Sequence, residues 1–139
     1  VFTMAKITRE VAELDYKRFL DSLDLDEELD KDILENQDQA NNLIKAIQKG
    51  RLLIDEDGTP SIDFIYSNKL RAKNNPDVKP LDKAVIASSG DLFFALSNGG
   101  GIDAKAIACC TGLMTNQVKQ LDPKDNILIV SILGFFIAS

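Results

Sequence analysis

The most apolar stretch of the chain lies at its end, where residues 127–138 are apolar at all but two positions. Asp122 and Pro123 precede this stretch, and both are typical of a helix start, because aspartate caps N–H groups and proline lacks an N–H. Asp125 adds a carboxylate to the first turn, where the helix dipole favours negative charge. A helix that is apolar on every side must be buried. We therefore predict a terminal helix that is covered by the second half of the chain and in part by another chain.

Helical periodicity predicts two amphipathic helices in the first half, at residues 8–25 and about 26–49. The apolar residues expected to share one face of the first helix are Ile7, Val11, Leu14, Phe19 and Leu23. Those expected to share one face of the second are Leu29, Ile33, Ala40, Ile44 and Ile47. Gly50 stands where a glycine commonly ends a helix.

A β-hairpin is predicted at residues 51–65, with Asp57 and Gly58 in a two-residue type I′ turn. Pro60 fits only the start of a strand or an unpaired edge, because proline has no N–H to donate. A ribbon of two strands is marginal alone, so we expect it to pack on helices or to pair with another chain. Residues 66–79 are polar and are predicted to form a mobile connector.

Further helices are predicted at residues 81–97, 103–111 and 115–121, ahead of the terminal helix. Residues 98–101, Asn-Gly-Gly-Gly, break the first of them from the second. The fold class is therefore α+β: one mainly helical domain over residues 1–139, with about five to six helices and one hairpin. Within it we expect an acidic helical pair at residues 7–49 and a helical subdomain at residues 80–139.

Charge is spread unevenly along the 139 residues, whose net charge is −6. Residues 1–58 hold fifteen acidic and eight basic residues, and the remainder holds seven and eight. An acidic chain without a basic stripe argues against nucleic acid and anionic membrane surfaces as partners. No secretory signal is visible, although Val1–Thr3 is either an added remnant or an extended start. Adjacent Cys109 and Cys110 make no disulfide framework, which favours a reducing, cytoplasmic location.

Candidate chemistry is sparse, because the chain has no histidine and so lacks the commonest general base and metal ligand. The carboxylates of residues 24–32 fit a solvated face better than a catalytic pair. Residues 55–58 fit a hairpin turn better than a calcium loop, and residues 98–101 fit a linker better than a phosphate loop. Cys109 and Cys110 are expected to be small buried side chains. The terminal run is too short for a membrane anchor, since twelve helical residues span about 18 Å. We expect no catalytic residue, metal or cofactor.

The order of residues in the second half resembles that of the small tail assembly chaperones of long-tailed bacteriophages. A hairpin and linker are followed by helices carrying the matching positions Ile107, Thr111, Gly112, Leu113, Val118, Leu121, Asp125 and Phe135 or Phe136. The resemblance covers residues 51–139 and leaves out the first two helices. The same residues also suit any succession of helices, because Gly112 stops one and Asp122 with Pro123 starts another.

The resemblance implies a non-enzymatic protein that binds the tape measure and tail tube proteins during tail assembly, and that also self-associates. The residues expected to bind partners are Ile129, Leu133, Phe135, Phe136, Leu113 and Val118. One alternative is a permanent structural protein of the virion or of another oligomeric scaffold. A second alternative is a small enzyme that uses carboxylates.

Overall fold

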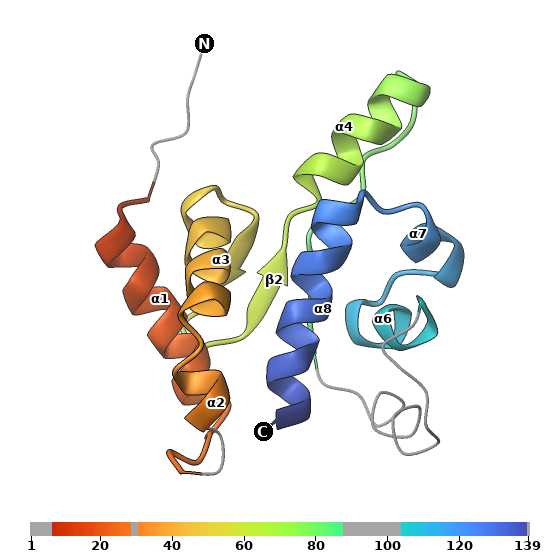
Figure 1. Cartoon of the computed structure of the whole chain (residues 1–139). Coiled ribbons are helices and arrows are strands. Elements are labelled where there is room, and N and C mark those ends of the chain that lie inside the picture. The colour runs from red at the N-terminus through yellow and green to blue at the C-terminus, as the bar shows by residue number, and fades with distance from the viewer. Residues whose placement is uncertain (1–6, 29–30, 88–103, 139) are drawn as a thin grey trace.

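The computed structural model describes residues 7–28, 31–87 and 104–138, which form a mainly helical α+β domain (Figure 1). Its elements are α1 (Arg9–Ser22), α2 (Lys31–Leu34), α3 (Gln37–Gln48), β1 (Leu52–Ile54), β2 (Pro60–Ile62), α4 (Ile65–Asn74), β3 (Ala84–Val85), α6 (Ala104–Thr111), α7 (Thr115–Lys119) and α8 (Pro123–Ala138). The predicted fold class is confirmed. None of the helices that the structure describes is long and apolar enough to cross a membrane.

Helix α1 begins as predicted but turns a different face to the core. The Thr8 side chain caps it by accepting a hydrogen bond from the Val11 N–H at 3.3 Å. Its buried residues are Ala12, Tyr16 and Phe19. Val11 and Leu14, which were expected in the core, are exposed instead. The two aromatic rings decide the rotation, because each buries more apolar area than a valine or leucine would.

The predicted second helix is two helices, α2 and α3, so the expectation of one continuous helix is wrong. Helix α2 ends at Leu34, and Asn36 caps α3, because its side-chain oxygen accepts a hydrogen bond from the Gln39 N–H at 3.0 Å. Asparagine favours such caps over helix interiors, where it competes with the backbone. The predicted end of α3 is confirmed: Lys49 is its C-cap and Gly50 has φ +75°.

The hairpin gains a third strand, so that the sheet order is β1-β2-β3 with both pairs antiparallel. Ile54 pairs with Pro60, which starts β2 as predicted. Residues 81–87, predicted to begin a helix, hold strand β3 and no helix, and residues 88–97 of that prediction, like residues 98–101, lie outside the described residues. Ala84 and Ile86 are buried whereas Val85 between them is exposed, the alternation of a strand.

The hairpin turn is not of type I′, because of its two central residues only Gly58 has a positive φ, at +84°. The Asp55 carbonyl accepts a hydrogen bond from the Gly58 N–H at 3.1 Å. The Asp55 carboxylate accepts two more, from the N–H groups of Asp57 at 2.9 Å and Thr59 at 2.8 Å. This side chain therefore organises the loop, which explains its acidic sequence without a bound cation.

Helix α4 occupies most of the segment that was predicted to be a mobile connector, and that prediction is wrong for residues 66–74. Its N-cap residue, Phe64, makes no side-chain capping bond, and Ser67 is its one buried residue. A helix without a cap or an apolar stripe gives little signal in the sequence. Tertiary contacts of Ser67 hold it in place instead.

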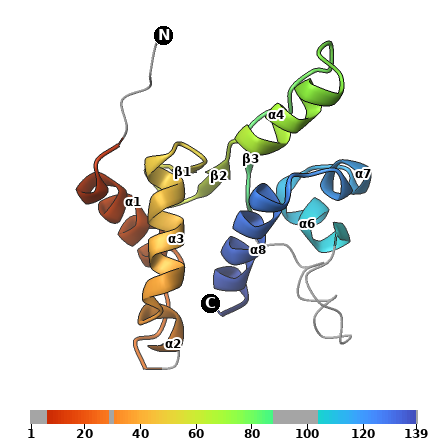
Figure 2. The same ribbon diagram turned by 45° about the horizontal axis from the view of Figure 1, so that its top comes forward.

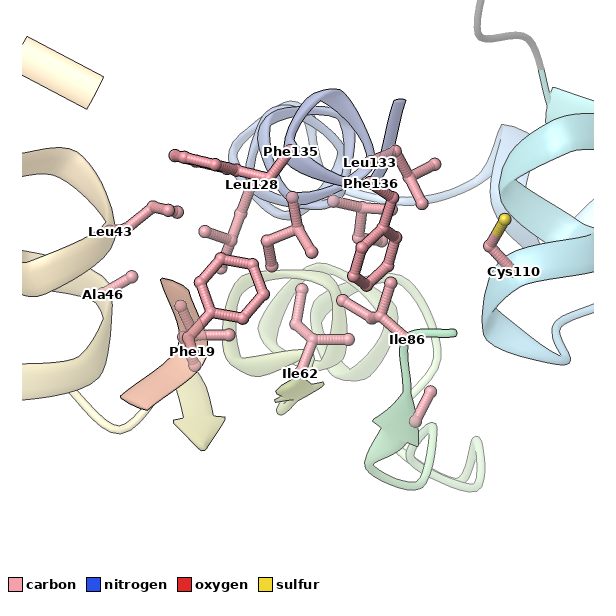
Figure 3. Close-up of a cluster of buried hydrophobic side chains, with 14 of the residues drawn as sticks. Phe19, Leu43, Ala46, Ile62, Ile86, Cys110, Leu128, Leu133, Phe135 and Phe136 are labelled. Carbon is pink, nitrogen blue, oxygen red and sulfur yellow. The ribbon is translucent and has the colours of Figure 1, made fainter. Parts of the chain in front are cut away.

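Helix α8 lies at the centre of the core, as its composition required (Figure 3). Phe135 is fully buried and meets Tyr16 and Phe19 edge-on, with ring centroids 6.4 and 5.6 Å apart. Phe136 meets Phe19 from the other side at 6.3 Å. Ile62 of the sheet and Ile86, which directly follows β3, face the same cluster (Figure 3). The covering layers thus come from both halves of the chain, whereas we had expected the second half and a partner chain.

Candidate protein-binding groove

A buried carboxylate fixes the first turn of α8. Asp125 has no solvent exposure. Its Oδ2 accepts hydrogen bonds from the backbone N–H of Ser67 at 2.8 Å and from the Ser67 hydroxyl at 2.7 Å. Its Oδ1 lies 3.5 Å from Nη2 of Arg51, which supplies the balancing charge. The sequence assigned Asp125 only a favourable interaction with the helix dipole, and it missed this network.

The same network joins three elements that are distant in sequence. The Ser67 hydroxyl also accepts a hydrogen bond from the Asp122 N–H at 2.9 Å, just before α8. Nη2 of Arg51 donates to the Lys124 carbonyl at 2.9 Å, and the Arg51 side chain is only 14% exposed. The position before β1, the first turn of α4 and the start of α8 are therefore held together. We call the set Arg51, Ser67 and Asp125 the latch.

Tyr66 gathers positive charge beside the latch. The Arg51 guanidinium carbon lies 4.7 Å from the centroid of the Tyr66 ring. Nζ of Lys124 lies 4.5 Å from the same centroid, and Nζ of Lys69 lies 5.9 Å from it. Cations at these distances are attracted by the electron-rich ring face. The ring holds like charges close together at the rim of the groove described next.

A groove of about 310 Å³ lies between α3 and α8, which stand beside each other in both views (Figures 1 and 2). Its lining residues are Asn42, Leu43, Lys45, Ala46, Lys49, Arg51, Lys124, Ile127, Leu128 and Ser131. We call this feature the α3–α8 groove. Its volume lies at the lower end of the range for ligand pockets, enough for the side chains of a partner but not for a whole helix.

The α3–α8 groove is basic and apolar within an acidic chain. Its charged lining residues are all cations, Lys45, Lys49, Arg51 and Lys124. Across the described ranges, only Arg51 of these four has an ion-pair partner. Ile127 is 65% exposed at its edge, although α8 is otherwise largely buried. Exposed apolar surface rimmed by charge is typical of protein-binding sites.

The partner-binding residues predicted from the sequence lie elsewhere. Ile129, Leu133 and Phe135 have no exposure, Phe136 and Val118 are buried as well, and Leu113 packs partly buried against the core. In this conformation their apolar surface is covered by the chain itself, so their role in binding stays a prediction. The large apolar side chains that are exposed on the described part of α8 are Ile127 and Ile137.

The remaining candidates from the sequence were weighed as metal or reactive sites, and residues 98–101 among them lie outside the described residues. No group of three or more Cys, Asp or Glu side chains is placed to hold a metal ion in the part of the chain that the structure describes. Cys110 is buried as expected, whereas Cys109 is exposed, contrary to expectation. A larger cleft of about 700 Å³ lies between the β3 segment and α6–α7, and Arg71, Lys79 and Lys83 are among its lining residues.

The chain matches no protein-family model, and no curated protein or solved structure shows significant similarity to it. The function therefore has to be argued from the residue pattern and from the groove.

Proposed function

We propose that this chain is a non-enzymatic tail assembly chaperone of a long-tailed bacteriophage. It binds the tape measure and tail tube proteins in the host cytoplasm while the tail is built. The observation that carries the proposal is the α3–α8 groove, which combines exposed apolar surface with three lysines that have no ion-pair partner among the described residues. The order of residues 107–136 within their helices supports the same proposal.

The chemistry of the groove suits binding rather than catalysis. Its charged side chains are three lysines and one arginine, and the lining contains no carboxylate, histidine or cysteine. Its one hydroxyl belongs to Ser131 and is engaged with the Ile127 carbonyl at 3.0 Å. A nucleophile requires an adjacent base, and the groove supplies none. Apolar and ionic contacts to another protein are what this lining can make.

A chaperone also has to remain dissolved while it covers an aggregation-prone client. The net charge of −6 provides repulsion between complexes, and the acidic residues concentrate in the first half of the chain. The groove lies where α3 of that half meets α8, so a client bound there leaves the exposed acidic side chains within residues 24–28, between α1 and α2, facing solvent.

Co-expression with the tape measure protein tests the proposal. We expect the tape measure protein to be soluble and to co-purify with this chain, and to aggregate when expressed alone. Mass spectrometry of mature virions is the second measurement, and we expect this chain to be absent from them. Its presence there in fixed stoichiometry would replace the chaperone by the alternative, a permanent structural protein.

One observation favours that alternative enough to keep it in the test. Val11, Leu14 and Met114 are exposed apolar side chains that do not line the α3–α8 groove, and a scaffold of many copies would cover them. Sedimentation of the purified chain distinguishes a defined oligomer from a monomer that associates only with its clients.

A further inference from the structure

We infer that the partner of the α3–α8 groove is an acidic amphipathic helix, laid along the groove with its apolar side chains inward and its carboxylates on the lysines. The inference rests on the proposed function, since it names the chemical class of client segment that the groove selects. It follows from the spacing, charge and burial of the lining residues.

The spacing of the lining residues gives the groove a direction. Lys45 and Lys49 are four residues apart on α3, so they lie one above the other on the same face, about 6 Å apart along the axis. On the opposite wall Lys124, Leu128 and Ser131 recur at spacings of four and three on α8. Two facing rows with helical periodicity form a channel about two turns long, which matches the anchors of a bound helix.

The charge of the groove determines whether it favours an acidic or a basic partner. Lys45 and Lys49 are exposed and line the groove together with Lys124, with no carboxylate among the lining residues. Asp125 lies behind the wall and is already engaged by the latch. Carboxylates of a partner would relieve the mutual repulsion of these lysines, whereas a basic helix would increase it. The cleft beside β3 also carries cations, but Asp82 is among its lining residues, so the α3–α8 groove is the preferred place for an acidic partner.

The apolar part of the groove sets the partner's shape. Leu43, Ala46 and Leu128 are buried and form its base, and Ile127 is exposed at its edge. Burying Ile127 removes from water the largest exposed apolar side chain of the lining. A helix with leucines three and four residues apart covers this strip and still points carboxylates at both rows of lysines. Single-stranded nucleic acid would instead need aromatic rings for its bases, and the lining contains none.

Peptide binding to the full chain tests the inference. The probe is a fluorescent peptide of about 20 residues, long enough to form a helix, with leucines at helical spacing and glutamates on both flanks. A second peptide carries lysine at every glutamate position. Fluorescence anisotropy should show binding of the acidic peptide, at least about tenfold tighter than that of the basic one, and weakened by salt.

Two matched variants locate the site. Lys45→Glu with Lys49→Glu reverses the charge of one wall, and Lys17→Glu with Lys119→Glu makes the same change of net charge at exposed positions outside the groove. We expect the first variant to bind the acidic peptide at least about tenfold more weakly, and the second to stay within about twofold of the unchanged chain. Ile127→Ser, at an exposed position where folding is not at stake, should weaken binding as well.

Three results would overturn the inference: equal losses in the two charge variants, no preference for the acidic peptide, or tighter binding of a single-stranded oligonucleotide than of the peptide. Its failure is distinguishable from that of the proposed function. If the tape measure protein still co-purifies with the Lys45→Glu, Lys49→Glu variant, the chaperone proposal stands and the groove assignment falls. If the acidic peptide binds but the tape measure protein does not co-purify, the groove assignment stands and the chaperone proposal falls.

Discussion

Replacing Asp125 with alanine asks whether this carboxylate is a structural link or an ordinary first-turn residue. In the folded chain it accepts two hydrogen bonds from Ser67 and faces the guanidinium of Arg51. Alanine would leave the Ser67 donors buried without an acceptor and the Arg51 charge without a counter-charge. Removing one partner of a buried ion pair costs about 3–5 kcal/mol. Because Arg51 keeps some contact with solvent, we expect the lower end, about 3 kcal/mol.

Asp38→Ala supplies the matched control. Asp38 is also an aspartate in the first turn of a helix, α3, but its side chain is exposed. Losing its interaction with the helix dipole should cost about 0.3–1 kcal/mol. Asp125→Asn should fall between the two alanine variants, because the amide keeps one oxygen that can accept from Ser67 but loses the charge that faces Arg51.

Urea unfolding followed by far-ultraviolet circular dichroism measures these differences. A loss of about 3 kcal/mol is a large part of the 5–15 kcal/mol that typically holds a domain, so the midpoint of Asp125→Ala should fall far below that of Asp38→Ala. The slope with urea should stay the same, since the fold of the remaining chain is unchanged. If the two alanine variants unfold within 1 kcal/mol of each other, the latch contributes little and our description of it is wrong.

Phe135→Ala should cost about 3–5 kcal/mol in urea unfolding, because the ring is fully buried; a soluble variant of unchanged stability would show that α8 is not the centre of the core. Gly58→Ala should lower the melting temperature more than Gly112→Ala: both have positive φ, but a Cβ at Gly58 would lie 2.6 Å from atoms of α1, whereas the one at Gly112 meets nothing within 4 Å. Equal shifts would refute the close approach. Burial raises the pKa of Tyr16 above 10.0, so the hydroxyl ionises first in the unfolded chain and stability should fall as the pH rises through and beyond 10.0. In a Tyr66→Phe variant the single tyrosine should ionise above that pH by absorbance at 295 nm, and a midpoint at or below it would contradict the burial.

The ends of several helices could be predicted from single residues. Thr8, Gly50 and Gly112 each stand at the helix end that the sequence assigned to them. Such signals are local: a capping side chain or a glycine with positive φ acts on the turn next to it. These helix ends therefore do not depend on the tertiary contacts of the rest of the chain.

Elements that depend on contacts across the fold could not be predicted in the same way. Strand β3 exists because Ala84 and Val85 pair with β2, and only two residues carry its alternation. Helix α4 depends on Ser67, whose partner Asp125 lies 58 positions later. The aromatic face of α1 was missed for a related reason, since Tyr16 and Phe19 are buried by Phe135 from the far end of the chain.

The candidate site likewise combines residues that a local pattern could predict with a position that depends on contacts across the fold. Lys45 and Lys49 were visible in the sequence as basic residues near the end of α3, where they complement the helix dipole. Their role in the α3–α8 groove depends on the opposite wall, which begins at Lys124 and is separated from them in sequence by the sheet, α4, α6 and α7. No pattern within a single helix contains that information.

Arg51 belongs to both the latch and the groove. Comparing it with the three lysines of the groove shows which residues stabilise the fold and which are available to bind a partner. Of the four cations in the groove, Arg51 is the one with an ion-pair partner within the described chain. Its guanidinium is already engaged with the Asp125 carboxylate and the Lys124 carbonyl. The capacity to bind carboxylates therefore rests with the three lysines, two of which stand on an exposed helix face. Changing those two should alter binding and leave the core intact, whereas changing Asp125 should lower the free energy of unfolding and leave the selectivity of the groove unchanged. A variant of Lys45 and Lys49 that unfolded like Asp125→Ala would mean that the groove is part of the core and not a surface for a partner.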